Sequence, residues 1–252
     1  MMRLIKRALA PFGLELTTAT QRADAALADL PAADRAIVER VAPFTMTSLE
    51  RRAGLIGAID HVVRHGIAGD IVECGVWRGG SMMAAALALM ARGDTSRDLW
   101  LYDTFEGMSE PTMADASVSG ESAAAQLART RRGTGVWCEA GLDDVRANLA
   151  STGYPAERLH FVAGKVEDTT PATLPSRIAL LRLDTDWYES TCHELAHLYP
   201  LLSCHGVLVI DDYGHWQGAR KAVDEYFAGW GAAAFLHRVD YTARLLVKRE
   251  SP

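Results

Sequence analysis

Residues 70–81 read DIVECGVWRGGS, and this stretch decides the fold. Its first five residues predict a short buried strand, and the apolar, alanine-rich residues 81–90 predict a helix. Gly75, Gly79 and Gly80 lie between them, so the chain can turn tightly and bring backbone N–H groups close to a ligand. The G-x-x-x-G spacing differs from the dinucleotide-binding G-x-G-x-x-G. An ordinary strand-to-helix turn also uses glycine, so the turn alone leaves the ligand open.

On both sides of this stretch, strand-like apolar runs alternate with helical patterns. Further strands are predicted at 98–102, 158–163, 178–183 and 206–210, with a hairpin at 235–241 and 243–248, and further helices at 48–64, 121–130, 143–150, 191–202 and 218–227. This alternation predicts an α/β fold with a doubly wound, mostly parallel, Rossmann-like sheet that has helices on both faces. Ligands of such sheets bind beyond the carboxyl ends of the strands. The Gly-, Pro- and Ser-rich residues 107–120 predict a mobile loop or lid.

The composition favours one globular domain. The 252 residues are 49% apolar and carry a formal net charge of −6, which indicates a sizeable core and disfavours a nucleic-acid partner. We expect an N-terminal helical segment over 1–43 and one domain over 44–252. Residues 1–16 predict a basic amphipathic helix rather than an export signal, and no apolar run is long enough for a membrane span. Four scattered cysteines favour a reducing, cytoplasmic location.

An acidic residue ends the second predicted strand. Asp103 follows Gly79 by 24 residues, close to the separation at which an acid binds the ribose hydroxyls of an adenosine-containing ligand. A strand-end aspartate also commonly caps the next turn. Together with the glycine turn, Asp103 favours an adenosine-containing ligand over a purely structural role.

Acidic residues also follow the fourth and fifth predicted strands. Asp184 and Asp186 come after one of these strands, and Asp211 and Asp212 come after the other. If the two strands are neighbours, three carboxylates converge, and a bound cation relieves their mutual repulsion. Oxygen ligands select Mg²⁺, Ca²⁺ or Mn²⁺ over zinc. The alternative is that one acid faces the crevice while the others cap helices or bind arginines.

Aromatic residues and a histidine come shortly after these acids. They are Trp187, Tyr188, Tyr213, His215 and Trp216. The set predicts the walls of a substrate pocket, and His215 could move a proton, although a surface histidine is the slightly favoured interpretation. The string HELAH at 193–197 matches a zinc-protease helix formally, but the sequence places no third ligand, so we assign it no metal.

Several strings together resemble the macrocin O-methyltransferase (TylF) family of natural-product methyltransferases. They are residues 44–48 (FTMTS), 69–81 (GDIVECGVWRGGS), 101–108 (LYDTFEGM), 166–169 (VEDT), 181–191 (LRLDTDWYEST) and 209–213 (VIDDY). The strings run in the family's order from about residue 44 to the C-terminus. The resemblance implies a class I S-adenosylmethionine-dependent methyltransferase fold with an antiparallel seventh strand. It does not extend to residues 111–120 and 214–216, so it leaves the acceptor open.

The resemblance also implies roles for individual residues. The residues around the methionine end of S-adenosylmethionine would be Glu73, Gly75, Trp77, Arg78, Gly79, Gly80 and Ser81. Those near the ribose would be Asp103, Thr104, Phe105, Glu106 and Gly107. Glu167 and Asp168 would lie by the adenine, and Thr45 and Met46 would fold over the cofactor. The ligands of Mg²⁺ or Mn²⁺ would be Asp184, Asp211 and Asp212.

The expected reaction is methyl transfer from S-adenosylmethionine to a hydroxyl of a small natural-product or sugar substrate. Asp184 would ligate the metal and accept the proton, with His215 as the alternative base. By analogy with relatives, we expect a homo-oligomer. The residues alone leave two alternatives: an NAD-type oxidoreductase on a related sheet, which the missing G-x-G-x-x-G disfavours, and a non-catalytic binding protein that retains the fold.

Overall fold

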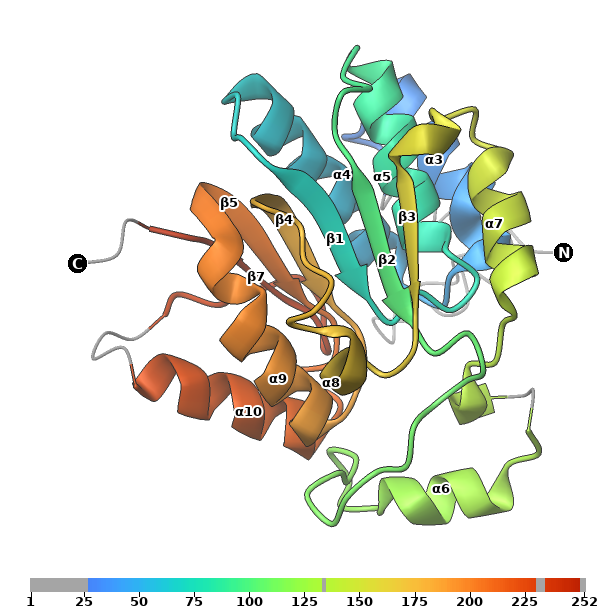
Figure 1. Ribbon diagram of the computed structural model, residues 1–252, viewed down its shortest axis with the longest axis vertical. Coiled ribbons are helices and arrows are strands. Elements are labelled where there is room, and N and C mark those ends of the chain that lie inside the picture. Colours follow the sequence, from blue (N-terminus) through green and yellow to red (C-terminus); the bar gives the residue numbers. More distant parts are fainter. Residues whose placement is uncertain (1–26, 133–134, 230–233, 250–252) are drawn as a thin grey trace, which may run out of the picture.

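A seven-stranded sheet forms the centre of the computed structural model, which describes residues 27–132, 135–229 and 234–249 (Figure 1). The strands are β1 (Asp70–Cys74), β2 (Leu99–Asp103), β3 (Leu159–Ala163), β4 (Ile178–Leu183), β5 (Leu202–Ile210), β6 (His237–Arg238) and β7 (Arg244–Val247). Their order is β3-β2-β1-β4-β5-β7-β6, and β7 is antiparallel to both of its neighbours while the other pairs are parallel. Residues 1–16, predicted to form a basic helix, lie outside the described residues.

The predicted doubly wound sheet is confirmed, and its central strands show why the pattern was informative. All residues of β4 are buried, and so are all but the first residue of β1, because helices cover both faces. The bounds of these two strands agree with the predicted ranges. Strand β5 begins at Leu202 instead of the predicted Gly206, because the partly exposed polar residues 203–205 gave no apolar pattern.

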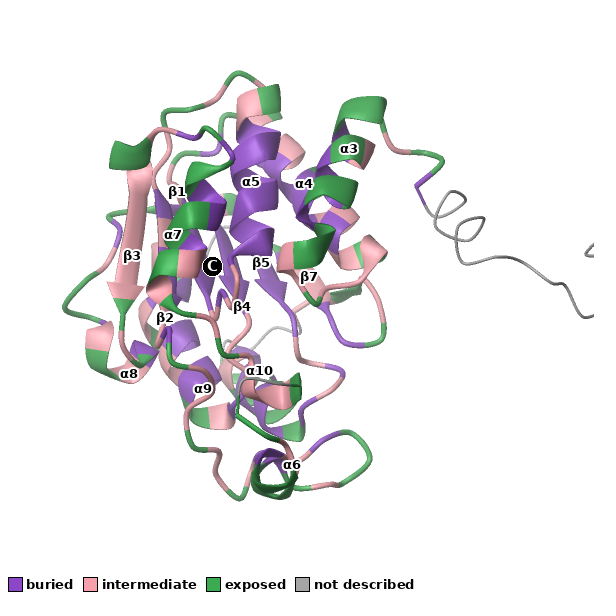
Figure 2. Cartoon of the chain, turned by 90° about the vertical axis from the view of Figure 1, so that its right-hand side faces the viewer, coloured by how far each residue is buried: buried purple, intermediate pink, exposed green. Residues whose placement is uncertain are grey.

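Helices cover the sheet in two layers (Figures 1 and 2). One layer contains α3 (Ala32–Val41), α4 (Leu49–Arg64), α5 (Gly80–Ala91) and α7 (Leu142–Ala150), and the other contains α8 (Val166–Thr169), α9 (Tyr188–His197) and α10 (Gln217–Ala228). Each layer closes its own apolar cluster, so that Ile71 packs in one and the next residue, Val72, in the other. No helix in these described ranges is long and apolar enough to span a bilayer.

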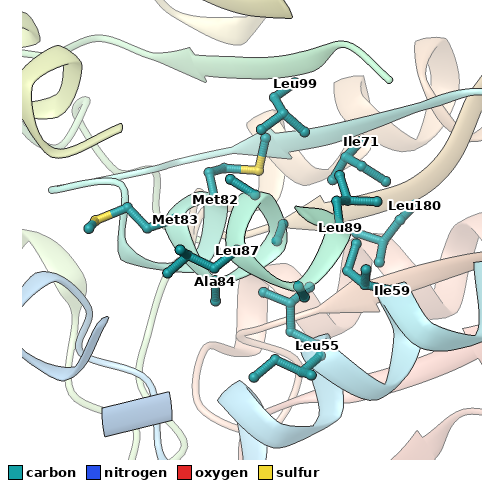
Figure 3. Packing of buried hydrophobic residues seen from close by; sticks show 14 of the residues in the cluster. Leu55, Ile59, Ile71, Met82, Met83, Ala84, Leu87, Leu89, Leu99 and Leu180 are labelled. Atoms are coloured by element: carbon teal, nitrogen blue, oxygen red, sulfur yellow. The ribbon is translucent and has the colours of Figure 1, made fainter. Parts of the chain in front are cut away.

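Helix α5 lies at the centre of the larger cluster. It is apolar on all sides, and residues 80–89 are all buried, as Figure 2 shows. Met82 packs toward Leu99 of the sheet, and Leu89 lies by Ile71 (Figure 3). Helix α5, which begins at the glycine turn, is thereby packed along its length against β1 and β2.

Helix α3 belongs to the same layer as α5. Val38 and Val41 are fully buried and join the larger cluster. At the end of α5, the Arg92 guanidinium forms an ion pair with Asp34 of α3 at 3.0 Å. The division between a helical segment at 1–43 and a domain at 44–252 stays a prediction.

The part of the chain that follows β2 and precedes α7 projects beyond the carboxyl ends of the strands, at the bottom of Figure 1. It contains α6 (Ala123–Arg129) and the 3-10 turn Gly135–Trp137. We call residues 108–138, apart from the undescribed 133–134, the cap segment. The third apolar cluster joins this segment to the rest of the domain, and its members include Met108, Leu127, Val136, Trp137, Trp187 and Trp216.

The loop of the cap segment has fixed partners, although its composition predicts a mobile lid. Asp115 is 1% exposed, and its carboxylate accepts hydrogen bonds from the N–H groups of Tyr188 (2.8 Å) and Thr112 (2.7 Å). The N–H of Val118 donates to the carbonyl oxygen of His215 at 2.7 Å. Composition could not indicate these anchors, because the partner residues follow β4 and β5. The structure thus anchors this loop to the start of α9 and to the β5–α10 connection, and its mobility stays a prediction.

Candidate active site

A cavity of about 480 Å³ lies between the carboxyl ends of β1, β2, β4 and β5 and the cap segment. The predicted site residues that line it are Thr45, Met46, Glu73, Gly75, Trp77, Ser81, Asp103, Thr104, Gly107, Glu167, Asp184, Asp211, Asp212 and His215. The predicted residues outside its lining are Arg78, Gly79, Gly80, Phe105, Glu106 and Asp168. The parallel strands therefore gather distant parts of the chain at one site, at the edge where such sheets bind ligands.

Arg78 has structural partners away from the cavity. Its guanidinium donates hydrogen bonds to both carboxylate oxygens of Asp144 on α7, at 2.8 and 2.9 Å. It also lies 5.1 Å from the centre of the Phe44 ring. Arg78 thus joins the chain before α4 to α7, and its side chain supports the site from outside.

The glycine turn places backbone directly against the neighbouring strand. Gly75 has a φ of 79°, and a Cβ on this residue would overlap the carbonyl oxygen of Asp184. Gly79, with a φ of 81°, is the N-cap residue of α5. Ser81 lines the cavity, so the N-terminal end of α5 faces the space where a ligand would bind.

Asp103 holds the same turn from the adjacent strand. Its carboxylate accepts hydrogen bonds from the backbone N–H groups of Val76 (2.7 Å), Trp77 (3.1 Å) and Phe105 (2.7 Å). Burial raises the pKa of Asp103, and these donors oppose the rise. The Asp103 side chain therefore caps the turn, as the structural alternative predicts, and it also lines the cavity. Because a carboxylate oxygen can accept more than one hydrogen bond, capping and ligand binding are compatible.

Three carboxyl groups converge at the cavity, those of Asp184, Asp186 and Asp212. One oxygen of each lies within 4.8 Å of the others. Burial raises the pKa of Asp186 to about 7, and the negative charges of Asp184 and Asp211 act in the same direction. Oδ2 of Asp212 is buried and has no hydrogen-bond partner among the described residues. Clustered, incompletely satisfied carboxylates of this kind are typical ligands of a hard divalent cation.

Asp211 does not join this trio, although the resemblance predicts it as a metal ligand. Arg182 donates to its Oδ1 at 2.6 Å, and Arg51 forms an ion pair with its Oδ2. The two guanidinium groups neutralise Asp211, whereas Asp186 makes no ion pair with any described residue. The structure thus brings Asp186, and not the predicted ligand Asp211, into one cluster with Asp184 and Asp212.

Arg182 is a site residue that the sequence-based set missed. It is 3% exposed, pairs with Glu73, and donates to Oδ2 of Asp184 at 2.6 Å. Burial raises the pKa of Glu73 to about 7, and the nearby Arg182 charge opposes that rise. The available signal was one arginine in the apolar run IALLRL, since a buried arginine requires carboxylate partners.

Only part of the predicted aromatic wall faces the cavity. His215 and Trp216 line it. Trp187 instead supports the cap segment, with its ring centre 5.0 Å from that of Trp216 at an interplanar angle of 72°. The hydroxyls of Tyr188 and Tyr213 donate to carboxylates on α10. Burial, with the nearby Arg51 charge, lowers the pKa of His215.

Comparison with known proteins places this geometry in a family. The sequence matches the family model described as Macrocin-O-methyltransferase (TylF) over residues 15–248. The 8-demethyl-8-(2,3-dimethoxy-alpha-L-rhamnosyl)-tetracenomycin-C 4'-O-methyltransferase of Streptomyces olivaceus is 37% identical over 215 residues, covering 84% of this chain and 79% of that protein. Demethyldecarbamoylnovobiocin O-methyltransferase of Streptomyces niveus is 32% identical, covering 78% and 72%. The solved structure of the O-methyltransferase NovP has a TM-score of 0.72 at 30% identity, covering 82% and 83%.

The strand order, the antiparallel β7 and the cavity at the strand ends define a class I S-adenosylmethionine-dependent methyltransferase. Because the family model spans nearly the whole sequence, the chain belongs to the macrocin O-methyltransferase (TylF) family. It is therefore an S-adenosylmethionine-dependent O-methyltransferase, and the alternatives of an NAD-type oxidoreductase and a non-catalytic binding protein are set aside.

Proposed function

We propose that this enzyme methylates a sugar hydroxyl of a natural-product glycoside, with a divalent cation bound beside the methyl donor. The relative from Streptomyces olivaceus is named for 4'-O-methylation of a rhamnosyl-tetracenomycin, and its 37% identity supports a glycosyl acceptor here. A cavity of about 480 Å³ lies in the size range of small-molecule sites.

An excess of carboxylates over arginines at the site is the observation that carries the cation proposal. The acids that line the cavity beside β1, β4 and β5 are Glu73, Asp184, Asp186, Asp211 and Asp212. Arg51 and Arg182 are the cations that pair with them among the described residues. Two guanidinium groups cannot neutralise five carboxylates, so the site favours further positive charge. A sulfonium ion and a divalent cation would supply it.

The donor atoms fit Mg²⁺ or Mn²⁺. We assign the ion to Asp184, Asp186 and Asp212, since their oxygens converge and one oxygen of Asp212 is buried without a partner. Asp184 and Asp212 are common to this trio and to the set that the family resemblance implies. A bound ion would hold two adjacent acceptor oxygens and lower the pKa of the reacting hydroxyl.

The methyl donor would extend along the glycine turn. In this arrangement Glu73 and Ser81 lie at its methionine end, Asp103 binds the ribose hydroxyls, and Glu167 lies by the adenine. Met46 would cover the cofactor from the side of the chain before α4. The cap segment would then exclude water from the reacting atoms.

Asp186 is the base that the geometry favours. Oδ2 of Asp184 already accepts a hydrogen bond from Arg182 at 2.6 Å, whereas Asp186 can bind the ion through one oxygen and take the proton on the other. Asp186 has no arginine partner in the described ranges, lines the cavity, and has a φ of 69°, a backbone conformation often found at functional sites. His215, the alternative base, lies farther toward the rim, beside Tyr241.

A methyl-transfer assay with the full chain tests this proposal. Methyl α-L-rhamnopyranoside and phenyl α-L-rhamnopyranoside serve as acceptors, with enzyme treated with EDTA and then resupplied with Mg²⁺. We expect turnover to disappear with EDTA and return with Mg²⁺. Full turnover after EDTA treatment would exclude the cation from the reaction.

The variant Asp184→Asn separates cofactor binding from chemistry. It should bind S-adenosylmethionine in calorimetry and lose turnover by about a hundredfold or more, because a metal ligand is lost. Asp98→Asn is the matched control, since Asp98 lies at the opposite end of the sheet and pairs with Arg158 at the surface. Normal turnover by Asp184→Asn would remove Asp184 from the mechanism.

A further inference from the structure

An aromatic side chain stands at the rim of the cavity without a role in the proposed chemistry. Tyr241, in the turn between β6 and β7, is 56% exposed and still lines the cavity together with Thr242. A single exposed aromatic residue needs no explanation by itself, so the informative fact is that this ring also borders the cavity. The surroundings of Tyr241 show whether it suits a ligand.

The turn that carries Tyr241 is held firmly. Oδ1 of Asp240 accepts hydrogen bonds from the N–H groups of Thr242 and Ala243, both at 2.8 Å. Its Oδ2 accepts one from the Ser48 hydroxyl at 2.9 Å and lies 3.1 Å from Nε of Arg51. Helix α4 therefore anchors the turn, and the ring is presented at the rim by a rigid support.

A second element fixes the backbone of Tyr241 from the other side. The N–H of Gly214 donates to the carbonyl oxygen of Thr242 at 2.7 Å. A Cβ on Gly214 would overlap the carbonyl oxygen of Tyr241, so only glycine permits this approach. The β5–α10 connection, which carries Asp212, is thereby set against the turn.

Aromatic rings lead from Tyr241 toward the acids. The Tyr241 hydroxyl lies 3.3 Å from Nδ1 of His215, and the two ring centres are 6.1 Å apart at an interplanar angle of 83°. The rings of His215 and Trp216 are 4.9 Å apart at 82°. The side chain of Trp216 lies next to that of Asp186, and both line the cavity. One wall of the cavity thus changes from carboxylate in the interior to aromatic at the rim.

Tyr241 and His215, we propose, form a subsite for the aglycone of the acceptor: a planar, apolar aglycone face packs on these rings while the sugar hydroxyl reaches the acids. This inference rests on the proposed function, because it takes the acceptor to be a glycoside. The polar sugar suits the carboxylate-lined interior, and the remainder of the acceptor then lies at the rim beside Tyr241. Planar groups pack favourably on exposed aromatic rings that are already fixed in place.

Two glycosides that differ only in the aglycone test the subsite. Phenyl α-L-rhamnopyranoside carries a planar ring, and methyl α-L-rhamnopyranoside does not. Tyr241→Ala should raise the KM for the phenyl glycoside by about threefold to tenfold, the range for loss of one aromatic contact. The KM for the methyl glycoside and for S-adenosylmethionine should stay unchanged. Tyr241→Phe should keep the preference, since the ring and not the hydroxyl makes the contact.

Phe235 provides a matched control. It is 79% exposed, lies just before β6, and is absent from the cavity lining. Phe235→Ala should therefore leave both KM values unchanged. An equal rise in the KM for both glycosides in Tyr241→Ala would overturn the subsite. A change in the oligomeric state of this variant that accounts for the rise in KM would overturn it too.

Direct binding separates this inference from the proposed function. Saturation-transfer NMR with S-adenosylhomocysteine present measures binding of each glycoside without turnover. If wild-type enzyme methylates neither glycoside yet binds the phenyl compound through Tyr241, the acceptor hydroxyl is misassigned and the subsite holds. If methylation occurs and Tyr241→Ala binds the phenyl glycoside as tightly as wild type, the subsite is wrong and the proposed function holds. Absence of binding by wild type overturns the subsite outright.

Discussion

A Cβ atom on Gly75 would overlap the carbonyl oxygen of Asp184. The contact follows from the pairing of β1 with β4: the N–H of Asp184 donates to the carbonyl oxygen of Cys74 at 2.9 Å, so the two strands end side by side. The turn that would hold the methyl donor is therefore in direct contact with the first acid of the proposed cation site. A change at Gly75 should affect both.

Gly75→Ala tests this contact. We expect a much weaker affinity for S-adenosylmethionine, by about tenfold or more, because backbone atoms must move and φ is 79°. Gly93→Ala is the matched control, since Gly93 has a φ of 74° and open space around a Cβ. Backbone strain alone, of about 1–2 kcal/mol, should lower the stability of the control without changing its cofactor affinity. Calorimetry and urea unfolding measure the two effects; equal cofactor affinities in both variants would contradict the argument.

Arg182→Met tests the buried ion-pair network. The substitution keeps an unbranched side chain but leaves Glu73 and Asp211 without their shared cation, which should cost about 3–5 kcal/mol of unfolding free energy. Arg158→Met is the comparison, because the pair of Arg158 with Asp98 is partly exposed and worth about 0–1 kcal/mol. Chemical denaturation measures both. Similar losses of unfolding free energy in the two variants would show that the buried pairs contribute no more to stability than the partly exposed pair.

The strands were predictable because they depend on local pattern. Parallel strands covered on both faces are continuous apolar runs, and β1 and β4 agree with their predicted bounds. Strand β6 has only two residues, which is too short for an apolar pattern to mark its bounds. The predicted range of 235–241 is therefore longer than the strand. The anchors of the cap segment were also invisible, because Asp115 and its partner Tyr188 are far apart in sequence.

The site was predictable where it follows strand ends and unpredictable where a helix contributes. Asp103, Asp184 and Asp212 end or follow strands and line the cavity. Arg51 lies on α4 and reaches Asp211, 160 residues away, so no local pattern indicates the pair. The assignment of individual cofactor and metal contacts, the oligomeric state, the cytoplasmic location and the absence of a nucleic-acid partner all stay predictions.

Asp103→Asn tests the strand-end acid. An amide has one acceptor oxygen where the carboxylate has two, so either the N–H of Phe105 or those of Val76 and Trp77 lose their partner. We expect an affinity for S-adenosylmethionine lower by about tenfold, from loss of a charge-assisted acceptor for the ribose. Asp94→Asn, which disturbs only an acid bonded to Ser96 and Arg97 outside the cavity, should bind the cofactor normally. An unchanged cofactor affinity in Asp103→Asn would argue for a purely structural role.

Glu194→Gln tests a buried acid behind the site. Glu194 is fully buried, and burial raises its pKa to about 8. Between pH 4.5 and 8 the folded protein keeps a proton on Glu194 that the unfolded chain releases, so this residue makes stability fall as pH rises, by at most about 1.4 kcal/mol per pH unit. The glutamine variant lacks this slope, so its stability relative to wild type should increase from pH 5 to pH 8.

Urea unfolding at several pH values measures that difference. Because other buried acids are present in both proteins, subtracting the two stability curves isolates Glu194. The exposed Glu225, whose pKa is lowered by its hydrogen bond with Lys221, is the control, and Glu225→Gln should give a flat difference over the same range. A flat difference for Glu194→Gln as well would mean that Glu194 is ionised in the folded protein.

The small third cluster gives this enzyme two parts that can change independently. The indole rings of Trp187 and Trp216 join the cap segment to the sheet, and the two large clusters contain no residue of it. Substitutions in the cap away from its anchor Asp115 therefore leave the two large clusters intact. Evolution can diversify which molecule is accepted while the machinery for methyl transfer stays the same.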